Sequence, residues 1–187
     1  MTILTQPIDL TPQDVERASE RDAKLYELID GELKEKTAGT RSLFIASRIC
    51  DRLNSVFYPQ IGFAAVEAMI YCFERKRHGR KPDVVYIRFD RLPTREIPEG
   101  DLFVAPDLVV EVLSPGNSGI ELDEKLNEYL GAGVAMVWIV NPESRTIRIY
   151  RQDGTTRLFR AGDVIEDESL LPGFRLMTGE IFPVQPA

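Results

Sequence analysis

The sequence predicts a mixed α/β (α+β) fold, in which a central mixed β-sheet is flanked by helices within a single domain. Three observations lead to this prediction. The chain has 187 residues, which suits one domain with a full hydrophobic core. Stretches with helical spacing of apolar residues alternate with short apolar stretches typical of strands. Residues 107–113 are largely apolar on both faces, as expected of an interior strand covered by helices.

Local signals mark where the individual elements begin and turn. Thr11-Pro12 is typical of a helix start, Asp30-Gly31 of a two-residue hairpin turn, and Ser118-x-x-Glu121 of a capping box. The predicted elements are a short helix over 11–22, hairpin strands over 25–29 and 33–37, a helix over 40–57, a strand or strand pair over 63–73, strands over 83–87 and 107–113, a helix over 118–130, strands over 135–140, 146–150 and 155–159, and strand fragments within 161–177. Residues 1–10 are expected to form a loose arm and residues 178–187 a loose tail within the domain 1–187.

The composition argues against several classes of protein. Hydrophobic residues make up 43% and charged residues 28% of the chain, as in ordinary globular proteins. No apolar run could span a bilayer, and residues 1–20 lack a signal-peptide pattern, so we expect a cytoplasmic protein without a membrane partner. Cys50 and Cys72 are expected to be reduced core residues, and 2 Cys with 1 His argue against a structural zinc site.

The charge distribution limits how the protein could bind nucleic acid. A net charge of −7 argues against a surface that is basic throughout. Two local clusters are basic, the run 75–81 and the region 145–160, so any contact with DNA depends on a local patch. The run 75–81 fits a phosphate-contacting loop and a solvated loop equally well, and His78 within it is expected to be solvated.

The stretch 105–133 carries the most informative charged residues. Glu111 lies inside the apolar strand 107–113, and Lys125 shares the apolar stripe of the following helix. A buried carboxylate must be protonated, paired or bound to a metal. Because the connecting turn is short, Lys125 can approach Glu111. If the strands 83–87 and 107–113 are neighbours, Asp83 converges on Glu111 as well.

The residues alone leave two interpretations of this cluster open. Mg²⁺ prefers oxygen ligands, commonly one or two carboxylates together with water and phosphate, and a nearby lysine stabilises negative charge; these are the requirements of phosphodiester hydrolysis. The alternative is a structural ion pair between Glu111 and Lys125 that joins strand and helix. Glu67 could add a carboxylate, although an exposed strand position is the simpler interpretation.

Several motifs in order resemble the Uma2 family (DUF820), a group of restriction-endonuclease-like proteins within the PD-(D/E)xK nuclease superfamily. The motifs cover roughly residues 20–150 and are Glu27-Leu-Ile-Asp-Gly-Glu-Leu33, Pro82-Asp83-Val-Val, Pro106-Asp-Leu-Val-Val-Glu-Val-Leu-Ser-Pro115, Asp123-Glu-Lys125 with Tyr129 and Gly133-Val134, and Trp138-Ile-Val-Asn-Pro142. The resemblance implies a restriction-endonuclease-like core, in which helices flank a mixed sheet and a metal lies beside two acidic strands.

The resemblance also implies roles for individual residues. Asp83 corresponds to the first metal-binding aspartate, Glu111 to the second acid, and Glu32 to an early acidic residue of the first core element. The superfamily pattern places a lysine two residues after the second acid, where this chain has Leu113, so Lys125 would be a displaced substitute.

We therefore expect an endonuclease that depends on Mg²⁺ or Mn²⁺ and hydrolyses phosphodiester bonds of DNA. A homodimer is the expected assembly, because many cleaving enzymes of this fold pair to cut two strands. The alternative is a catalytically weak or inactive protein of the nuclease fold that acts as a binding module, which the acidic charge balance and Leu113 favour. A small-molecule hydrolase on the same core is a third interpretation.

Overall fold

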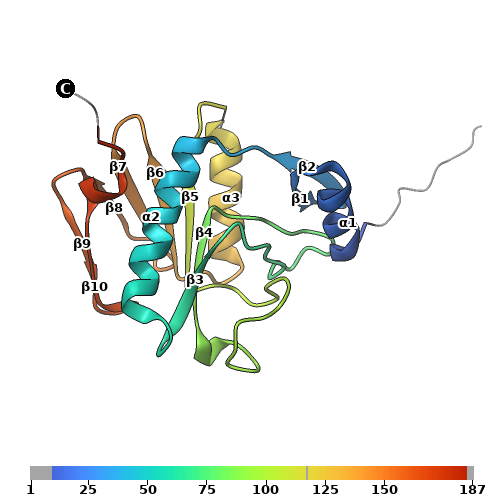
Figure 1. Cartoon of the computed structure of the whole chain (residues 1–187), viewed down its shortest axis with the longest axis horizontal. Coiled ribbons are helices and arrows are strands. Elements are labelled where there is room, and N and C mark those ends of the chain that lie inside the picture. Colours follow the sequence, from blue (N-terminus) through green and yellow to red (C-terminus); the bar gives the residue numbers. More distant parts are fainter. Residues whose placement is uncertain (1–9, 117, 185–187) are drawn as a thin grey trace, which may run out of the picture.

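A computed structural model describes residues 10–116 and 118–184 (Figure 1). In this part of the chain the main sheet has six strands in the order β3-β4-β5-β6-β7-β8, and the predicted fold class is confirmed. The parallel pair is β5 with β6, and the other neighbours are antiparallel. The bounds of these strands are Gly62–Val66, Val84–Arg88, Leu108–Val112, Met136–Asn141, Thr146–Arg151 and Thr156–Arg160.

Helices cover the sheet from both sides. In Figure 1, α2 (Thr40–Phe57) lies in front of the sheet and α3 (Gly119–Gly131) behind it. Successive side chains of β5 point in turn toward α2 and toward α3. Val110 belongs to the core cluster that includes residues of α2, and Val109 belongs to the cluster that contains Tyr129 of α3. Because both faces of β5 are buried, any charged side chain on it needs a partner.

The crossover from β5 to β6 places α3 above the site strand. The hydroxyl of Ser118 accepts a hydrogen bond from the backbone N–H of Glu121 at 3.1 Å, which caps the first turn of the helix. Gly133, with φ of +92°, follows the end of the helix in a conformation that favours glycine. A parallel pair requires such a crossover connection, and this one puts Lys125 on the side of α3 that faces the sheet.

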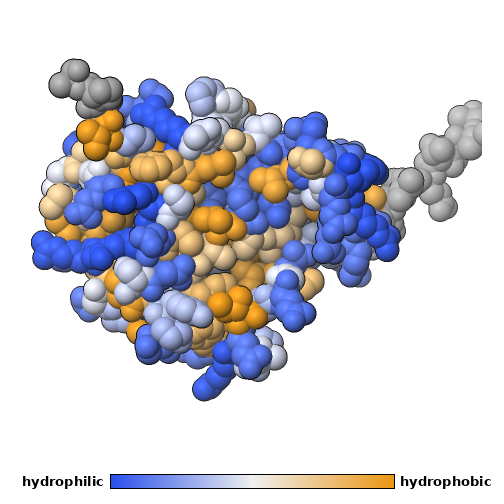
Figure 2. Space-filling view, in the orientation of Figure 1, coloured by the Kyte–Doolittle hydropathy of each residue, from blue (hydrophilic) through white to orange (hydrophobic). Residues whose placement is uncertain are grey.

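A hairpin and a helix near the start of the chain form a separate corner of the molecule. The helix α1 spans Pro12–Asp22, and the antiparallel strands β1 and β2 span Leu25–Ile29 and Glu32–Lys36. Leu28 and Gly79 exchange backbone hydrogen bonds of 3.0 and 2.7 Å, which tie the hairpin to the loop before β4. Hydrophilic side chains cover this corner, whereas hydrophobic ones gather nearer the centre of the same face (Figure 2).

Two predicted segments differ from the structure. The strand predicted over 63–73 ends at Val66, because Glu67 adopts a left-handed φ of +52° and an irregular loop follows. The tail predicted to be loose from residue 178 is wrong over its first part, since Thr178–Ile181 form a 3₁₀-helix, η2, and Ile181 and Phe182 are buried in the core. Leu10 is described, but the rest of the predicted arm over 1–10 lies outside the described residues.

The remaining strands close the core on the α2 side. Val164–Asp167 (β9) and Leu171–Met177 (β10) form a two-stranded antiparallel sheet whose buried residues join the cluster below α2. Phe89–Arg91 form a short 3₁₀-helix, η1, after β4. None of the described helices is long and apolar enough to cross a membrane.

Candidate active site

Two carboxylates meet at one end of the strands β4 and β5. Val84 of β4 pairs with Val110 of β5, so extending this register by one residue places Asp83 opposite Glu111. Asp83 Oδ2 accepts a hydrogen bond from the backbone N–H of Val112 at 2.6 Å. Both acids are buried, and both line a cavity of about 220 Å³. The strand pairing therefore brings Asp83 and Glu111 together, as the sequence predicted for the case that these two strands are neighbours.

Glu111 is held by side chains from α3. The hydroxyl of Tyr129 donates to Glu111 Oε1 at 2.6 Å, and Lys125 Nζ lies 3.3 Å from the same oxygen. Burial raises the pKa of Glu111 above its ordinary value; Lys125 opposes this rise and the charge of Asp83 adds to it. The site therefore favours the protonated form of this carboxyl group.

Lys125 is shared between two carboxylates. Its Nζ lies 3.3 Å from Glu111 Oε1 and 3.3 Å from Glu27 Oε1. Burial alone would lower the pKa of Lys125, but the charges of Glu111 and Glu27 outweigh burial and raise the pKa. Lys125 is therefore a fixed positive charge at neutral pH and cannot serve as a general base.

A second lysine, which the sequence analysis did not identify, reaches the cavity from the last residue of β2. Lys36 Nζ lies 2.8 Å from Asp83 Oδ1 and 2.8 Å from Glu67 Oε2, and it donates to the backbone carbonyl of Lys81 at 2.6 Å. Burial would lower its pKa, but Asp83, Glu111 and Glu67 raise it. In the alternation of β2, Lys36 falls on the same side as the exposed Lys34, so periodicity offered no signal for its burial.

The hairpin supplies a third acid, and it is Glu27. Glu27 is buried, accepts a hydrogen bond from the backbone N–H of Lys81 at 3.0 Å, and lines the cavity. Burial would raise the pKa of Glu27, but Lys125 and Arg80 lower it, so Glu27 is ionised. A single acid within the apolar strand Leu25–Ile29 is the same kind of signal that identified Glu111, and it could have identified Glu27.

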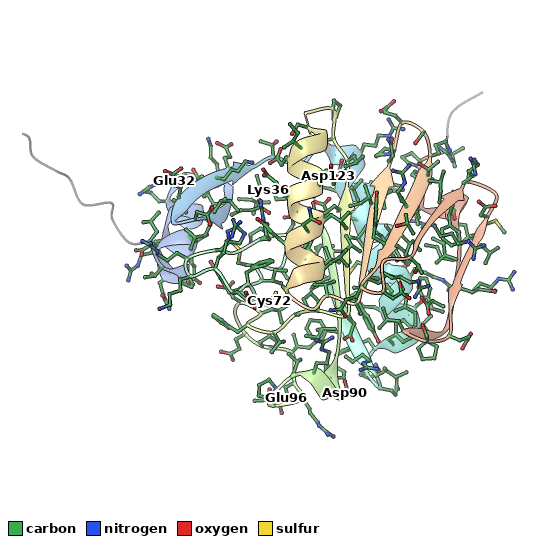
Figure 3. All side chains as sticks on the ribbon, turned by 180° about the vertical axis from the view of Figure 1, so that it is seen from behind. Glu32, Lys36, Cys72, Asp90, Glu96 and Asp123 are labelled. Atoms are coloured by element: carbon green, nitrogen blue, oxygen red, sulfur yellow. The ribbon has the colours of Figure 1, made fainter. Side chains whose placement is uncertain are left out.

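The structure does not bring Glu32 to this cluster. Glu32 is exposed as the first residue of β2 and does not line the cavity. In Figure 3, Glu32 lies on the outer part of the hairpin, whereas Lys36 lies where the hairpin meets α3. The strand advances about 3.3 Å per residue, so four residues separate the two side chains by roughly 13 Å.

The basic run 75–81 is divided between buried and exposed residues: Arg80 forms ion pairs inside the protein, whereas Arg75, Lys76 and Arg77 are exposed. Arg80 is buried, with its guanidinium 3.1 Å from Glu27 Oε2 and 2.7 Å from Glu128 Oε2. Arg75 lies 3.3 Å from Asp30. The expectation that His78 is solvated is wrong, because His78 is 2% exposed and its Nε2 lies 3.2 Å from Glu128. The loop folds inward because it carries the positive charges that Glu27 and Glu128 require.

The residues at the cavity fit a hard divalent cation. Mg²⁺ commonly takes one or two carboxylates and completes its coordination with water and phosphate oxygens. Asp83 and Glu111 provide two such carboxylates at paired positions of adjacent strands, and both line the same cavity. Within residues 10–116 and 118–184 there is no group of three or more His, Cys, Asp or Glu placed to hold an ion. A cation here would thus depend on Asp83, Glu111 and non-protein ligands.

A mixed sheet with two carboxylates at neighbouring strand ends, beside lysines from a hairpin and a helix, defines a nuclease-like α/β protein. The family model of Uma2, described as "Putative restriction endonuclease", matches residues 12–179, and the chain belongs to this family. A crystal structure described as "a putative nuclease belonging to DUF820", from Anabaena variabilis ATCC 29413, has a similar fold, with a TM-score of 0.72 and 25% sequence identity. The match covers 86% of this chain and 90% of that chain. No curated protein matches the sequence.

Proposed function

We propose that the protein is a metal-dependent endonuclease that hydrolyses phosphodiester bonds of DNA, with Asp83 and Glu111 as the ligands of Mg²⁺ or Mn²⁺. The observation that carries the proposal is the convergence of these two buried acids with Lys36 and Lys125 in one cavity of about 220 Å³. The family membership supports the same reaction class. Assembly as a homodimer is part of the proposal, because two copies could cut both strands of a duplex.

The proposed reaction gives separate tasks to the metal ligands, to the two lysines and to the residues that hold them in place. Hydrolysis adds water to phosphorus and breaks one P–O ester bond. A divalent cation, when bound, would polarise the phosphate and lower the pKa of a coordinated water. Lys36 and Lys125 stay protonated and neutralise negative charge that develops on the phosphate. Tyr129 holds the Glu111 carboxylate in one orientation through its 2.6 Å hydrogen bond, and Glu27 holds Lys125.

The test is cleavage of supercoiled plasmid and of single-stranded DNA with Mg²⁺ or Mn²⁺. The wild type should convert the plasmid to nicked or linear forms only when the metal is present. Glu111→Gln should lower the rate by at least about 100-fold, because it removes a ligand of the cation that stabilises the developing charge. The matched control is Glu32→Gln, which removes an exposed acid outside the cavity and should cut like the wild type. Equal loss in both variants, or cutting without metal, would contradict the assignment.

A second function, a binding module without cleavage, is favoured by one specific observation. The acids already have protein partners, since Asp83 contacts Lys36 and the N–H of Val112, and Glu111 contacts Tyr129 and Lys125. A closed network of this kind can be purely structural. Binding of DNA by a wild-type protein that never cuts, with no heat of Mn²⁺ binding, would favour this second function.

A further inference from the structure

The side of the sheet that carries Glu111 continues beyond α3 as an open surface. Glu111 of β5 pairs with Ile139 of β6, Ile139 with Arg148 of β7, and Arg148 with Leu158 of β8. Paired residues point to the same face of a sheet. In Figure 3, viewed from the α3 side, β7 and β8 lie beside α3 without a helix over them. A groove of about 640 Å³ occupies this surface and is lined by residues of β6, β7 and β8, together with Leu113 and with Leu122 of α3.

Two arginines on this surface keep their side chains available. Arg148 and Arg160 are exposed, line the groove and belong to neighbouring strands. Arg148 contacts the hydroxyl of Tyr150 at 3.5 Å, and the backbone N–H of Arg160, not its guanidinium, donates to Asp163. Neither guanidinium forms an ion pair with any residue that the structure describes. Each therefore presents several N–H donors to solvent, and such donors fit phosphate oxygens.

The contrast with the other basic cluster narrows the location of a nucleic-acid contact. In the run 75–81, Arg80 is paired with Glu27 inside the protein and His78 is buried, whereas Arg75 is exposed and forms a surface ion pair with Asp30. In a protein with a net charge of −7, the positively charged side chains that are not paired with carboxylates are the ones that can bind a polyanion. The region 145–160 supplies Arg148 and Arg160, two exposed arginines without an ion pair among the described residues, on the adjacent strands β7 and β8.

The position of these arginines connects them to the candidate active site. Arg148 is two strand spacings from Glu111 in the same row, about 10 Å between backbones. Ile139 lies between them, so no charged residue of that row separates acid from arginine. We propose that an arginine face, defined by Arg148 and Arg160, binds the sugar–phosphate backbone of the nucleic-acid strand whose phosphodiester lies at Asp83 and Glu111. This inference rests on the proposed function and names the surface by which the substrate is held.

The test is the salt-dependent affinity for a short fluorescein-labelled oligodeoxynucleotide, single- and double-stranded, measured by anisotropy with Ca²⁺ in place of Mg²⁺. The double variant Arg148→Gln/Arg160→Gln should bind about tenfold more weakly for each arginine. The slope of log K against log salt concentration should fall by about 1 for each phosphate contact removed, about 2 in total.

A matched control changes the same formal charge on the other side of the sheet. Arg157 lies on β8 beside the ring of Phe159, which belongs to the α2-side core, and Arg175 lies on β10. Arg157→Gln/Arg175→Gln should bind like the wild type. Equal affinities of the wild type and the Arg148/Arg160 variant, or equal losses in both double variants, would overturn the arginine face.

The outcomes separate this inference from the proposed function. A wild type that binds through Arg148 and Arg160 but never cuts with Mg²⁺ or Mn²⁺ retains the arginine face and loses the nuclease. A wild type that cuts plasmid while the Arg148→Gln/Arg160→Gln variant cuts and binds equally well retains the nuclease and loses the arginine face. A wild type without measurable binding of either oligonucleotide form overturns the arginine face, and plasmid cleavage then decides the nuclease by itself.

Discussion

Lys36 is the residue on which the charge balance of the cavity depends most directly. It is the cation nearest to Asp83 and also contacts Glu67, with distances of 2.8 Å to both carboxylates. Lys125 performs the equivalent task for Glu111 and Glu27. Each lysine therefore bridges two carboxylates: Lys36 bridges Asp83 and Glu67, and Lys125 bridges Glu111 and Glu27. Removing either one leaves two negative charges in a partly dehydrated space, which is costly.

Lys36→Met should destabilise the fold by about 3 kcal/mol at neutral pH, because it leaves Asp83 and Glu67 without their common cation. Urea unfolding measures this change. The matched control is Lys34→Met on the same strand, which removes an exposed ion pair with Glu121 and should cost less than about 1 kcal/mol. Similar losses for the two variants would show that Lys36 does not neutralise a buried cluster.

The raised pKa of Glu111 predicts how stability depends on pH. Between its ordinary and its raised pKa the folded state binds more protons than the unfolded state, so the contribution of Glu111 to stability is present at low pH and is lost as pH rises through the folded pKa. Glu111→Gln cannot ionise. The wild type should therefore lose stability relative to Glu111→Gln as pH rises over this window, measured by urea unfolding at constant ionic strength. A stability difference between the wild type and Glu111→Gln that stays constant over this window would count against Glu111 as the source.

At the scale of elements, the close contact between the hairpin and the loop before β4 fixes the position of Glu27 and Arg80. Gly79 exchanges backbone hydrogen bonds with Leu28, and a Cβ at Gly79 would lie 2.3 Å from the ring of Tyr71. A residue larger than glycine cannot fit without displacing that ring or the backbone. The two segments that supply Glu27 and Arg80 are thereby held in register.

Gly79→Ala should therefore destabilise the protein by about 1–3 kcal/mol, the usual cost of overpacking. Thermal unfolding gives the comparison, with Gly100→Ala as the control, because nothing lies within 4 Å of a Cβ at Gly100. A Gly79 variant as stable as the wild type would mean that Tyr71 moves aside without cost.

Most elements could be predicted because their signals are local. The cap at Ser118, the Asp30-Gly31 turn and the apolar periodicity of α2 depend only on neighbouring residues. The strand predicted beyond Val66 failed because the left-handed φ of Glu67 is stabilised by distant contacts, among them the ion pair with Lys36. The buried C-terminal segment was missed because the burial of Ile181 and Phe182 depends on contacts with elements distant in the sequence.

The candidate site divides along the same line. Asp83, Glu111 and Lys125 could be chosen from the sequence because each is a charged residue set into or beside an apolar pattern. Lys36 could not, because the strand that carries it has no buried face to reveal it. The sequence analysis chose Glu32 as the acid of the hairpin because Glu32 matched a position in the family pattern. The structure instead buries Glu27 and leaves Glu32 exposed.

At the scale of the whole molecule, binding of a divalent cation should stabilise the folded state. A ligand that binds the folded state alone adds about 2.7 kcal/mol at a concentration 100 times its Kd. Mn²⁺ should therefore raise the unfolding temperature of the wild type and produce a titration signal in calorimetry. Glu111→Gln should lose both effects, whereas Glu32→Gln should keep them. An unchanged response in Glu111→Gln would remove Glu111 from the set of ligands.

The contacts of the cavity join parts of the chain that are far apart in sequence, and this has a consequence for its synthesis. Glu27 and Lys36 are made early, whereas Lys125, which forms the ion pair with Glu27, and Glu111, which completes the cavity, emerge later. A domain generally folds as a unit once its chain has been synthesised. A nascent chain that has not yet reached residue 125 thus carries the hairpin but lacks Lys125, and only the completed domain can have an assembled site.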